Sequence, residues 1–260
     1  MRKIKAVFFD IDGTLTEHGE GPFKDDVEAM EETSSLGHLL YINTGRSLAN
    51  IPVQILDLPF WNGIVAGGGT HALLKESSGK YKTIYHKWVD EEHLMEICAW
   101  YLKNKKQLVL EGENDCYVIN PSVRKFSMSS IKIISRYDDI KNLYPLEFIT
   151  KLTMEDIKTA EEKELLEKNF SVNVFPNYAE AILKTENKAK GMSFILEAVG
   201  IKREDSVALG DSVNDLEMIK YAGIGVAMGN ASAELKAAAK AITANCGEGG
   251  VCQALKRFVL

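Results

Sequence analysis

Two aspartates separated by a single residue, Asp10 and Asp12, stand where an apolar run gives way to a glycine. The apolar run at residues 6–9, within a strand expected at 4–9, is typical of a fully buried strand of a parallel sheet. Two carboxylates at the end of such a strand cost folding free energy unless other groups pair with them. Ligands of open α/β sheets bind at the carboxyl ends of the strands. The pair therefore suggests a nucleophile and an acid/base partner beside a cation.

Three further polar strings stand at expected strand ends or helix starts. Residues 43–46 (Asn-Thr-Gly-Arg) directly follow a strand expected at 39–42. Residues 187–191 (Asn-Lys-Ala-Lys-Gly) open an expected helix, and residues 210–215 (Gly-Asp-Ser-Val-Asn-Asp) follow a strand expected at 205–209. Each string alone is explained as well by a cap or a turn. Together they supply carboxylates, a hydroxyl and an ammonium at one sheet edge, which suits phosphoryl transfer through an aspartyl-phosphate with Mg²⁺.

The four strings resemble the sequence motifs of the haloacid dehalogenase-like superfamily. Their spacing is similar to that of the Cof-type branch, in which a type IIB cap is inserted between the second and third motifs, and the resemblance covers essentially the whole chain. It implies that Asp10 is the nucleophile and that Asp12 protonates the leaving oxygen and then activates water. It also implies that Thr44, Gly45 and Lys188 bind the transferring phosphate. The dehalogenases of the superfamily lack an aspartate at the place of Asp12, so the resemblance favours a phosphatase.

The resemblance also implies a metal site. The carboxylates of Asp10 and Asp211 and the backbone carbonyl of Asp12 would bind Mg²⁺. Asn214 and Asp215 would support the metal, in part through water or by orienting the lysine.

Two lysines compete for the phosphate-binding role, because Lys188 and Lys190 open the same expected helix. Residues two apart on a helix point about 200° apart, so only one of them can face the site. Lys188 matches the family register when counted back from the Gly200 turn, and Lys190 is the alternative.

One departure from the family is the string Ala66-Gly67-Gly68-Gly69-Thr70, which stands where Asn-Gly-Ala is common. These glycines permit close backbone approach to a ligand or merely a turn.

The order of elements predicts an α/β fold: a Rossmann-like, parallel-sheet core with an inserted α+β cap domain. Strand and helix alternate over the first 75 residues and again from about residue 187, which predicts a parallel sheet. Between them, strands in adjacent pairs with grouped helices predict the α+β domain. We expect the core at 1–83 and 184–260 and the cap at 84–183. The stretch 120–153 gives no clear pattern.

The expected elements follow from hydrophobic periodicity and from turn residues. Helices are expected at about 25–36, 47–56, 90–103, 155–168, 188–199, 213–221, 231–239 and 249–258. Strands are expected at 4–9, 39–42, 63–66, 81–86, 108–111, 116–119, 171–175, 179–184, 205–209, 223–227 and 241–243.

The composition narrows the class of protein. The 260 residues are 45% hydrophobic and 26% charged, as in an ordinary globular protein. A formal net charge of −6 argues against nucleic-acid binding, and no run approaches the roughly 18 apolar residues of a membrane span. The N-terminus shows no signal-peptide pattern, so a cytoplasmic location is expected. The cysteines have no CxxC spacing and are expected to be reduced thiols, without zinc or a disulfide framework.

The sequence thus predicts a Mg²⁺-dependent phosphatase of small phosphorylated metabolites, with sugar phosphates as the leading class. The inserted domain would act as a lid that excludes water and selects the substrate. A phosphomutase or a non-catalytic binding module on the same fold is the alternative, and the lack of membrane spans excludes an ion pump. His18 and the basic cluster of Arg124, Lys125 and Lys132 are explained more simply as solvated surface than as substrate contacts.

Overall fold

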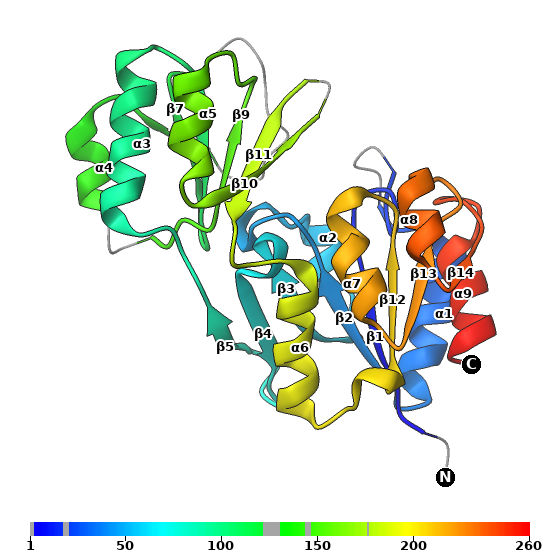
Figure 1. Cartoon of the computed structure of the whole chain (residues 1–260). Helices are drawn as coiled ribbons and strands as arrows, with labels where there is room; N and C mark the ends of the chain where they lie inside the picture. The colour runs from blue at the N-terminus through cyan, green and yellow to red at the C-terminus, as the bar shows by residue number, and fades with distance from the viewer. Residues whose placement is uncertain (1–2, 18–20, 122–130, 144–146, 176) are drawn as a thin grey trace. The chain divides into compact units, whose positions relative to one another are not determined.

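The computed structural model describes residues 3–17, 21–121, 131–143, 147–175 and 177–260. The chain divides into two compact units (Figure 1). The first comprises Met1–Gly45, Pro52–His86 and Asn187–Leu260, and the second comprises Arg46–Ile51 and Lys87–Glu186. The two stretches of alternating strands and helices therefore come together in one unit. The segment Arg46–Ile51, which lies inside the core range 1–83 that the sequence predicts, belongs to the second unit.

The first unit is built on an eight-stranded sheet in the order β14-β13-β12-β1-β2-β3-β4-β5. The strands are β1 (Ala6–Phe9), β2 (Leu39–Asn43), β3 (Trp61–Ala66), β4 (His71–Lys75), β5 (Tyr81–His86), β12 (Ser206–Gly210), β13 (Ile224–Ala227) and β14 (Ala241–Ile242). All pairings from β14 to β3 are parallel, and β4 and β5 add an antiparallel edge. The sequence predicts the parallel sheet only over the first 75 residues, which places residues 81–86 in the middle region, but β5 pairs with β4 in the first unit.

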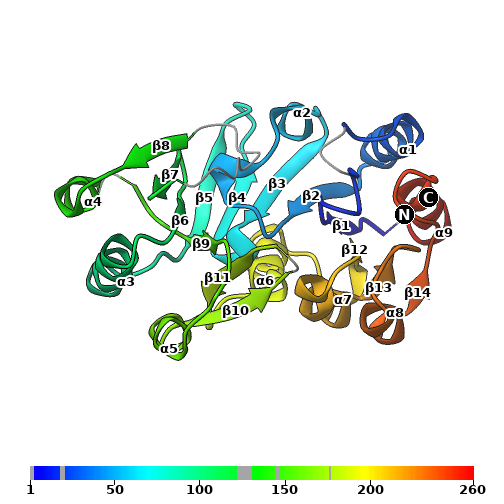
Figure 2. The same ribbon diagram turned by 90° about the horizontal axis from the view of Figure 1, so that it is seen from above.

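Helices cover both faces of this sheet. They are α1 (Lys24–Ser35), α2 (Val53–Leu56), α6 (Lys188–Val199), α7 (Leu216–Tyr221), α8 (Ala233–Ala238) and α9 (Gly250–Phe258). Figure 2 shows α1 and α9 on one face and α6, α7 and α8 on the other. Strand β1 lies between β2 and β12 and is fully buried, as its unbroken apolar run predicts.

Some expected helices are shorter than the sequence pattern predicts. The helix expected at 47–56 is a 3₁₀ turn, Leu48–Asn50, followed by the single turn of α2. Pro52 separates the two because it has no N–H to donate to a continuing helix. The helix expected at 213–221 likewise begins as a 3₁₀ turn, Val213–Asp215, before α7.

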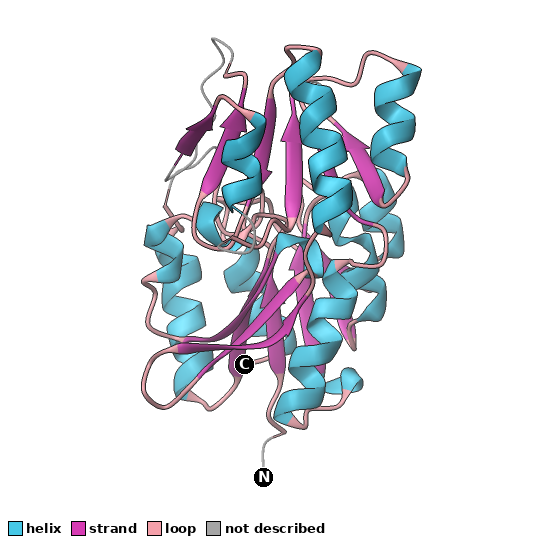
Figure 3. Cartoon of the chain, turned by 90° about the vertical axis from the view of Figure 1, so that its left-hand side faces the viewer, coloured by secondary structure: helices cyan, strands magenta, loops and turns pink. Residues whose placement is uncertain are grey.

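The second unit contains a six-stranded sheet in the order β10-β11-β9-β6-β7-β8. Its elements are α3 (Glu91–Lys103), β6 (Leu108–Glu111), β7 (Cys116–Ile119), β8 (Ile131–Ile134), α4 (Tyr137–Leu143), β9 (Lys151–Met154), α5 (Ala160–Glu167), β10 (Phe170–Val174) and β11 (Ala179–Leu183). The stretch 120–153, which the sequence left unassigned, contributes β8, α4 and the start of β9. Helix α5 starts only at Ala160, because Thr159 caps it by accepting from the Glu162 N–H at 3.1 Å. Figure 3 distinguishes the strands and helices of both units.

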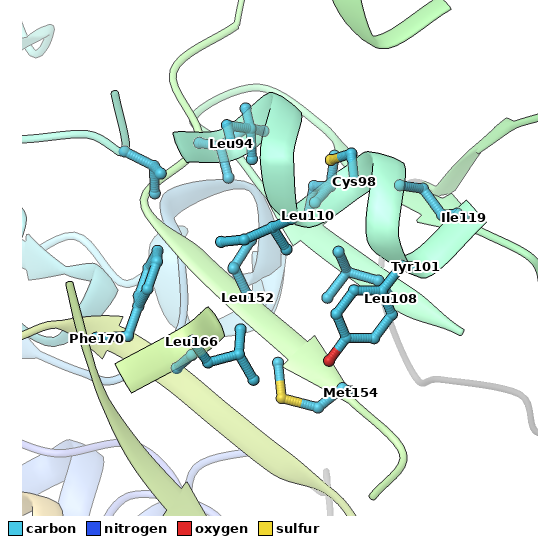
Figure 4. Packing of buried hydrophobic residues seen from close by; sticks show 14 of the residues in the cluster. Leu94, Cys98, Tyr101, Leu108, Leu110, Ile119, Leu152, Met154, Leu166 and Phe170 are labelled. Atoms are coloured by element: carbon cyan, nitrogen blue, oxygen red, sulfur yellow. The ribbon is translucent and has the colours of Figure 1, made fainter. Parts of the chain in front are cut away.

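One face of the second sheet packs against helices. Side chains of successive strand residues alternate between the two faces, so Leu108 and Leu110 of β6 join Leu152 and Met154 of β9 on one side. Leu94, Cys98 and Tyr101 of α3, with Leu166 of α5 and Phe170, belong to the same core (Figure 4).

The opposite face of this sheet carries a buried charged cluster. Lys151 Nζ lies 2.5 Å from Glu180 Oε1 and 3.6 Å from Glu111 Oε1. Thr153 Oγ1 donates to Glu111 Oε1 at 2.6 Å. Burial by itself raises the pKa of Glu111, but the charge of Lys151 and the hydrogen bonds from Thr153 and Ser47 together outweigh burial and lower the pKa.

Replacing Lys151 by methionine is expected to destabilise the protein by about 3 kcal/mol or more, because the substitution leaves two carboxylates without their counter-ion. Urea unfolding of the purified protein measures this loss. The control is Lys132→Met, which removes the exposed pair between Lys132 and Asp115 and should cost about 1 kcal/mol or less. Equal losses in the two variants would contradict a structural role for the Lys151 cluster.

Two general observations complete the description. Among the helices of the described residues, none combines the length and the hydropathy that spanning a bilayer requires. All four cysteines are free thiols. His18, Arg124 and Lys125, considered above as surface residues, lie outside the described residues.

Candidate active site

Asp10 directly follows β1 at the carboxyl edge of the first sheet. Its N–H donates to the Leu209 carbonyl at 3.0 Å, which ties it to β12, and its side chain is buried. The chain then turns, with Asp12 exposed. Gly13 has a φ of +79°, and a Cβ at this position would lie only 2.3 Å from Asp211 Oδ2. A residue with a side chain therefore does not fit where the first motif packs against Asp211.

Lys188 reaches Asp10 from the first turn of α6. Its Nζ lies 2.6 Å from Asp10 Oδ1 and 2.5 Å from Asp215 Oδ1, and the side chain is 1% exposed. Lys190 points elsewhere, with its Nζ 5.5 Å from the centre of the Tyr85 ring. The structure thus brings Lys188, and not Lys190, to the aspartates, as expected for residues two apart on a helix.

The glycine run after β3 allows α6 to come close. A Cβ on Gly69 would lie 2.0 Å from the Asn187 carbonyl oxygen, and a Cβ on Gly191 would lie 3.0 Å from the Gly69 Cα. Asn187 is the N-cap of α6 and accepts from the Lys190 N–H at 2.9 Å. The string that departs from the family pattern therefore has a packing role: it lets the start of the lysine-bearing helix dock against the loop.

Asp215 organises the loop after β12. Its Oδ2 accepts from the N–H groups of Asp211 and Ser212 at 3.0 and 3.1 Å, while its Oδ1 binds Lys188. Asn214 Oδ1 accepts from Ser212 Oγ at 2.8 Å. With both carboxylate oxygens engaged, Asp215 positions the loop and the lysine together.

The second motif lies beside this loop. Thr44 is buried at the end of β2, where its N–H donates to the Val65 carbonyl at 2.9 Å and its carbonyl accepts from Gly68 at 3.0 Å. A Cβ on Gly45 would lie 3.4 Å from Asn214 Nδ2, so the second and fourth motifs are neighbours.

Asn43 makes a contact that the sequence analysis did not single out. Its Nδ2 donates to the Lys188 carbonyl at 3.1 Å, which links the end of β2 to the start of α6. Asn43 is the last residue of β2, directly before Thr44. This position at a strand end was the feature of the sequence that could have marked Asn43 as part of the site.

Asp10, Asp211 and Asp215 form a cluster of three carboxylates, and two of them, Asp10 and Asp215, bind the Lys188 ammonium. Asp10, Asp211 and Asp215 each offer one oxygen, and these oxygens lie within 4.8 Å of one another. Burial, and after it the charge of Asp215, raises the pKa of Asp10 well above its usual 3.8, although Lys188 opposes this. Burial by itself lowers the pKa of Lys188, but Asp10 and Asp215 reverse that effect and raise it. The cluster formally holds two more negative than positive charges and is an acidic group able to hold a metal ion.

Comparison with known proteins gives the family. The sequence model of the haloacid dehalogenase-like hydrolase family matches residues 7–255 of this chain. A 5-amino-6-(5-phospho-D-ribitylamino)uracil phosphatase of Bacillus subtilis is 28% identical, over 99% of this chain and 96% of that protein. A Streptococcus pyogenes protein named as a bifunctional phosphatase/peptidyl-prolyl cis-trans isomerase is 27% identical over 100% of this chain, which spans 55% of that longer protein.

Solved structures agree with the sequence match. The structure of the subclass IIB sugar phosphatase BT4131 superposes with a TM-score of 0.82 at 30% identity, covering 98% of both chains. This likeness confirms the predicted α/β core with an inserted α+β domain. The chain therefore belongs to the haloacid dehalogenase-like hydrolase family and is an enzyme of its phosphatase class.

Proposed function

We propose that the protein is a Mg²⁺-dependent phosphatase that hydrolyses small phosphorylated metabolites, with sugar phosphates as the leading class. The observation that carries the proposal is the buried contact between Lys188 and Asp10 inside a cluster of three carboxylates. A sugar phosphatase and a phosphatase of a phosphoribityl compound among the similar proteins support the substrate class. The inserted domain, expected at 84–183, is proposed to select the substrate.

The donor set fits Mg²⁺. Asp211 Oδ1 is buried and accepts no hydrogen bond from any described residue, as expected of an oxygen that serves as a cation ligand. Mg²⁺ prefers oxygen ligands and is usually held by one or two carboxylates together with substrate phosphate. We assign Asp10, Asp211 and the backbone carbonyl of Asp12 as its ligands, with Asn214 and Asp215 in support. When bound, the ion neutralises negative charge on the phosphoryl group and on the carboxylates.

The residues can carry out hydrolysis in two steps. In the first, the Asp10 carboxylate attacks phosphorus, the bond from phosphorus to the leaving oxygen breaks, and the Asp12 carboxyl donates its proton to that oxygen. In the second, Asp12 takes a proton from water, the water oxygen attacks phosphorus, and the bond to Asp10 breaks to release inorganic phosphate. Lys188, with Thr44 and Gly45, holds the phosphoryl oxygens through both steps.

A screen of phosphorylated metabolites with Mg²⁺ or with EDTA tests the proposal. We expect release of inorganic phosphate from sugar phosphates in Mg²⁺ and its loss in EDTA. Release that persists in EDTA would contradict the metal dependence. An isomerised product without net phosphate release would instead identify a phosphomutase, and no turnover by folded protein would favour a binding module.

The metal-free protein is expected to lose stability as pH rises. Burial, and after it the charge of Asp215, raises the pKa of Asp211 from 3.8 to about 7. The folded state therefore binds this proton more tightly than the unfolded chain does, and the resulting stability, complete below pH 3.8, is lost as pH rises through about 7.

Thermal unfolding in EDTA should therefore show a Tm that falls by about 3 °C or more between pH 5 and pH 8. Added Mg²⁺ should raise the Tm more at pH 8 than at pH 5, because the ion needs the ionised carboxylate. Asp211→Asn should reduce the pH dependence, leaving the part that Asp10 contributes, and abolish the gain from Mg²⁺. A variant that keeps the full gain would exclude Asp211 as a ligand.

A further inference from the structure

The loop after β13 ties together two loops of the proposed active site. The Met228 N–H donates to the Gly210 carbonyl at 2.9 Å, and the Ser232 N–H donates to the Asp211 carbonyl at 3.0 Å. Between these two residues, Asn230 Nδ2 donates to the Gly13 carbonyl at 2.9 Å. Residues 228–232 therefore hold the loop of Asp211 through its backbone and the turn after Asp12 through one side chain.

The amide of Asn230 is engaged at both ends. Its Oδ1 accepts from the Cys246 N–H at 2.7 Å. A backbone N–H can only donate, so the atom facing Cys246 must be oxygen and the atom facing the Gly13 carbonyl must be nitrogen. Cys246 is itself buried, and its Sγ contacts the Thr14 carbonyl at 3.3 Å. The backbone carbonyls of Gly13 and Thr14, the two residues after Asp12, are thus contacted by Asn230 and Cys246, respectively.

Bonds within the Asp12 turn fix its shape, since the N–H groups of Thr14, Leu15 and Thr16 donate to the Ile11 carbonyl at 3.2, 2.9 and 3.0 Å. Asn230 adds a link from this turn to the loop after β13. Gly13 adopts a positive φ against the Asp211 carboxylate, and within the turn its own N–H donates to the Thr16 carbonyl at 2.8 Å. Asp12 itself is exposed, so burial does not hold its side chain in place. A displacement of its backbone by a fraction of an ångström would move the carboxyl relative to the leaving oxygen, to which acid catalysis is sensitive.

We propose that Asn230 is a positioning residue for acid catalysis: its amide holds the Gly13 carbonyl so that the Asp12 carboxyl meets the leaving oxygen. The inference rests on the proposed function. Asn230 touches neither substrate nor metal in this role and acts only through the turn. An amide side chain is suited to this because it offers a donor for Gly13 and an acceptor for Cys246 at once.

The test compares two substrates. Nitrophenolate leaves p-nitrophenyl phosphate readily without a proton, whereas the alkoxide of a sugar phosphate needs one. For Asn230→Ala, we expect kcat/KM for the sugar phosphate to fall about tenfold more than kcat/KM for p-nitrophenyl phosphate. A loss of folded protein would lower both values equally, so equal losses, or none, would overturn the proposal.

Asn230→Asp is the second variant: it keeps the acceptor for Cys246, replaces the donor to Gly13 by an acceptor oxygen and adds one negative charge. It should show the same uneven loss. The matched control is Asn104→Ala in the second unit, which also removes a 2.9 Å bond from an amide side chain to a backbone carbonyl and should change the two substrates equally.

Hydrogen exchange read by mass spectrometry separates this inference from the proposed function. If the unmodified protein hydrolyses neither substrate, the proposed function fails, yet the amides of residues 11–16 should still exchange faster in Asn230→Ala than in the unmodified protein. Unchanged exchange in that peptide would overturn the positioning role whatever the activity.

Discussion

Asp10→Asn is expected to lower phosphate release by about 10⁴-fold or more, because an amide cannot form the aspartyl-phosphate. The same substitution should leave the thermal stability unchanged or higher. Burial and neighbouring carboxylates raise the pKa of Asp10, so its charge is unfavourable in the folded protein. Loss of turnover with retained stability, measured by steady-state kinetics and thermal unfolding, would separate a catalytic from a structural role.

Asp57→Asn serves as the control for this substitution. Asp57 is an exposed residue at the end of α2, so the same chemical change there should leave turnover and Tm unaltered. Substantial turnover by a homogeneous preparation of Asp10→Asn would exclude Asp10 as the nucleophile.

Lys188→Met is expected to affect both stability and activity. The buried ammonium binds Asp10 and Asp215 at 2.6 and 2.5 Å, and removing one partner of a buried ionic cluster costs about 3–5 kcal/mol. Turnover should fall about 10³-fold, because the transferring phosphoryl group loses its cationic side chain. Urea unfolding and steady-state kinetics measure the two effects.

Lys190→Met is the matched control, since it is the same substitution two residues later in the same helix. Its ammonium lies over the Tyr85 ring. We expect the free energy of unfolding to change by less than about 1 kcal/mol. A larger loss of turnover in Lys190→Met than in Lys188→Met would reverse the assignment of the two lysines.

Much of the fold could be predicted because its signals are local. The apolar run of β1 and the N-cap Asn187 before α6 are readable from a few consecutive residues. The helix bounds Lys188–Val199 agree with the sequence pattern. Where a pattern was incomplete, as in the stretch 120–153, prediction failed because short strands such as β8 depend on their neighbours in the sheet.

The candidate site likewise has features that the sequence predicts and features that depend on tertiary contacts. Each motif is a short string at a strand end or helix start, so the identities of Asp10, Asp12 and Asp211 as candidates follow from the sequence. Which lysine reaches Asp10 follows from the rotation of α6, whose close approach depends on Gly69. Asn230 carried only a weak signal, a Gly-Asn pair after β13, because its partners Gly13 and Cys246 are far from it in the sequence.

The sequence by itself determined the α/β class and the set of groups gathered for chemistry, because hydrophobic periodicity and strand-end motifs are properties of neighbouring residues. Only the tertiary structure decided the pairing of Lys188 with Asp10 and Asp215, the packing role of the glycine run and the hold of Asn230 on the Asp12 turn. These depend on contacts between residues tens to hundreds of positions apart, such as the 178 positions between Asp10 and Lys188. The Asp10/Asp12 pair can be recognised from the residues directly around it. The contact of Asp10 with Lys188 exists only in the folded chain.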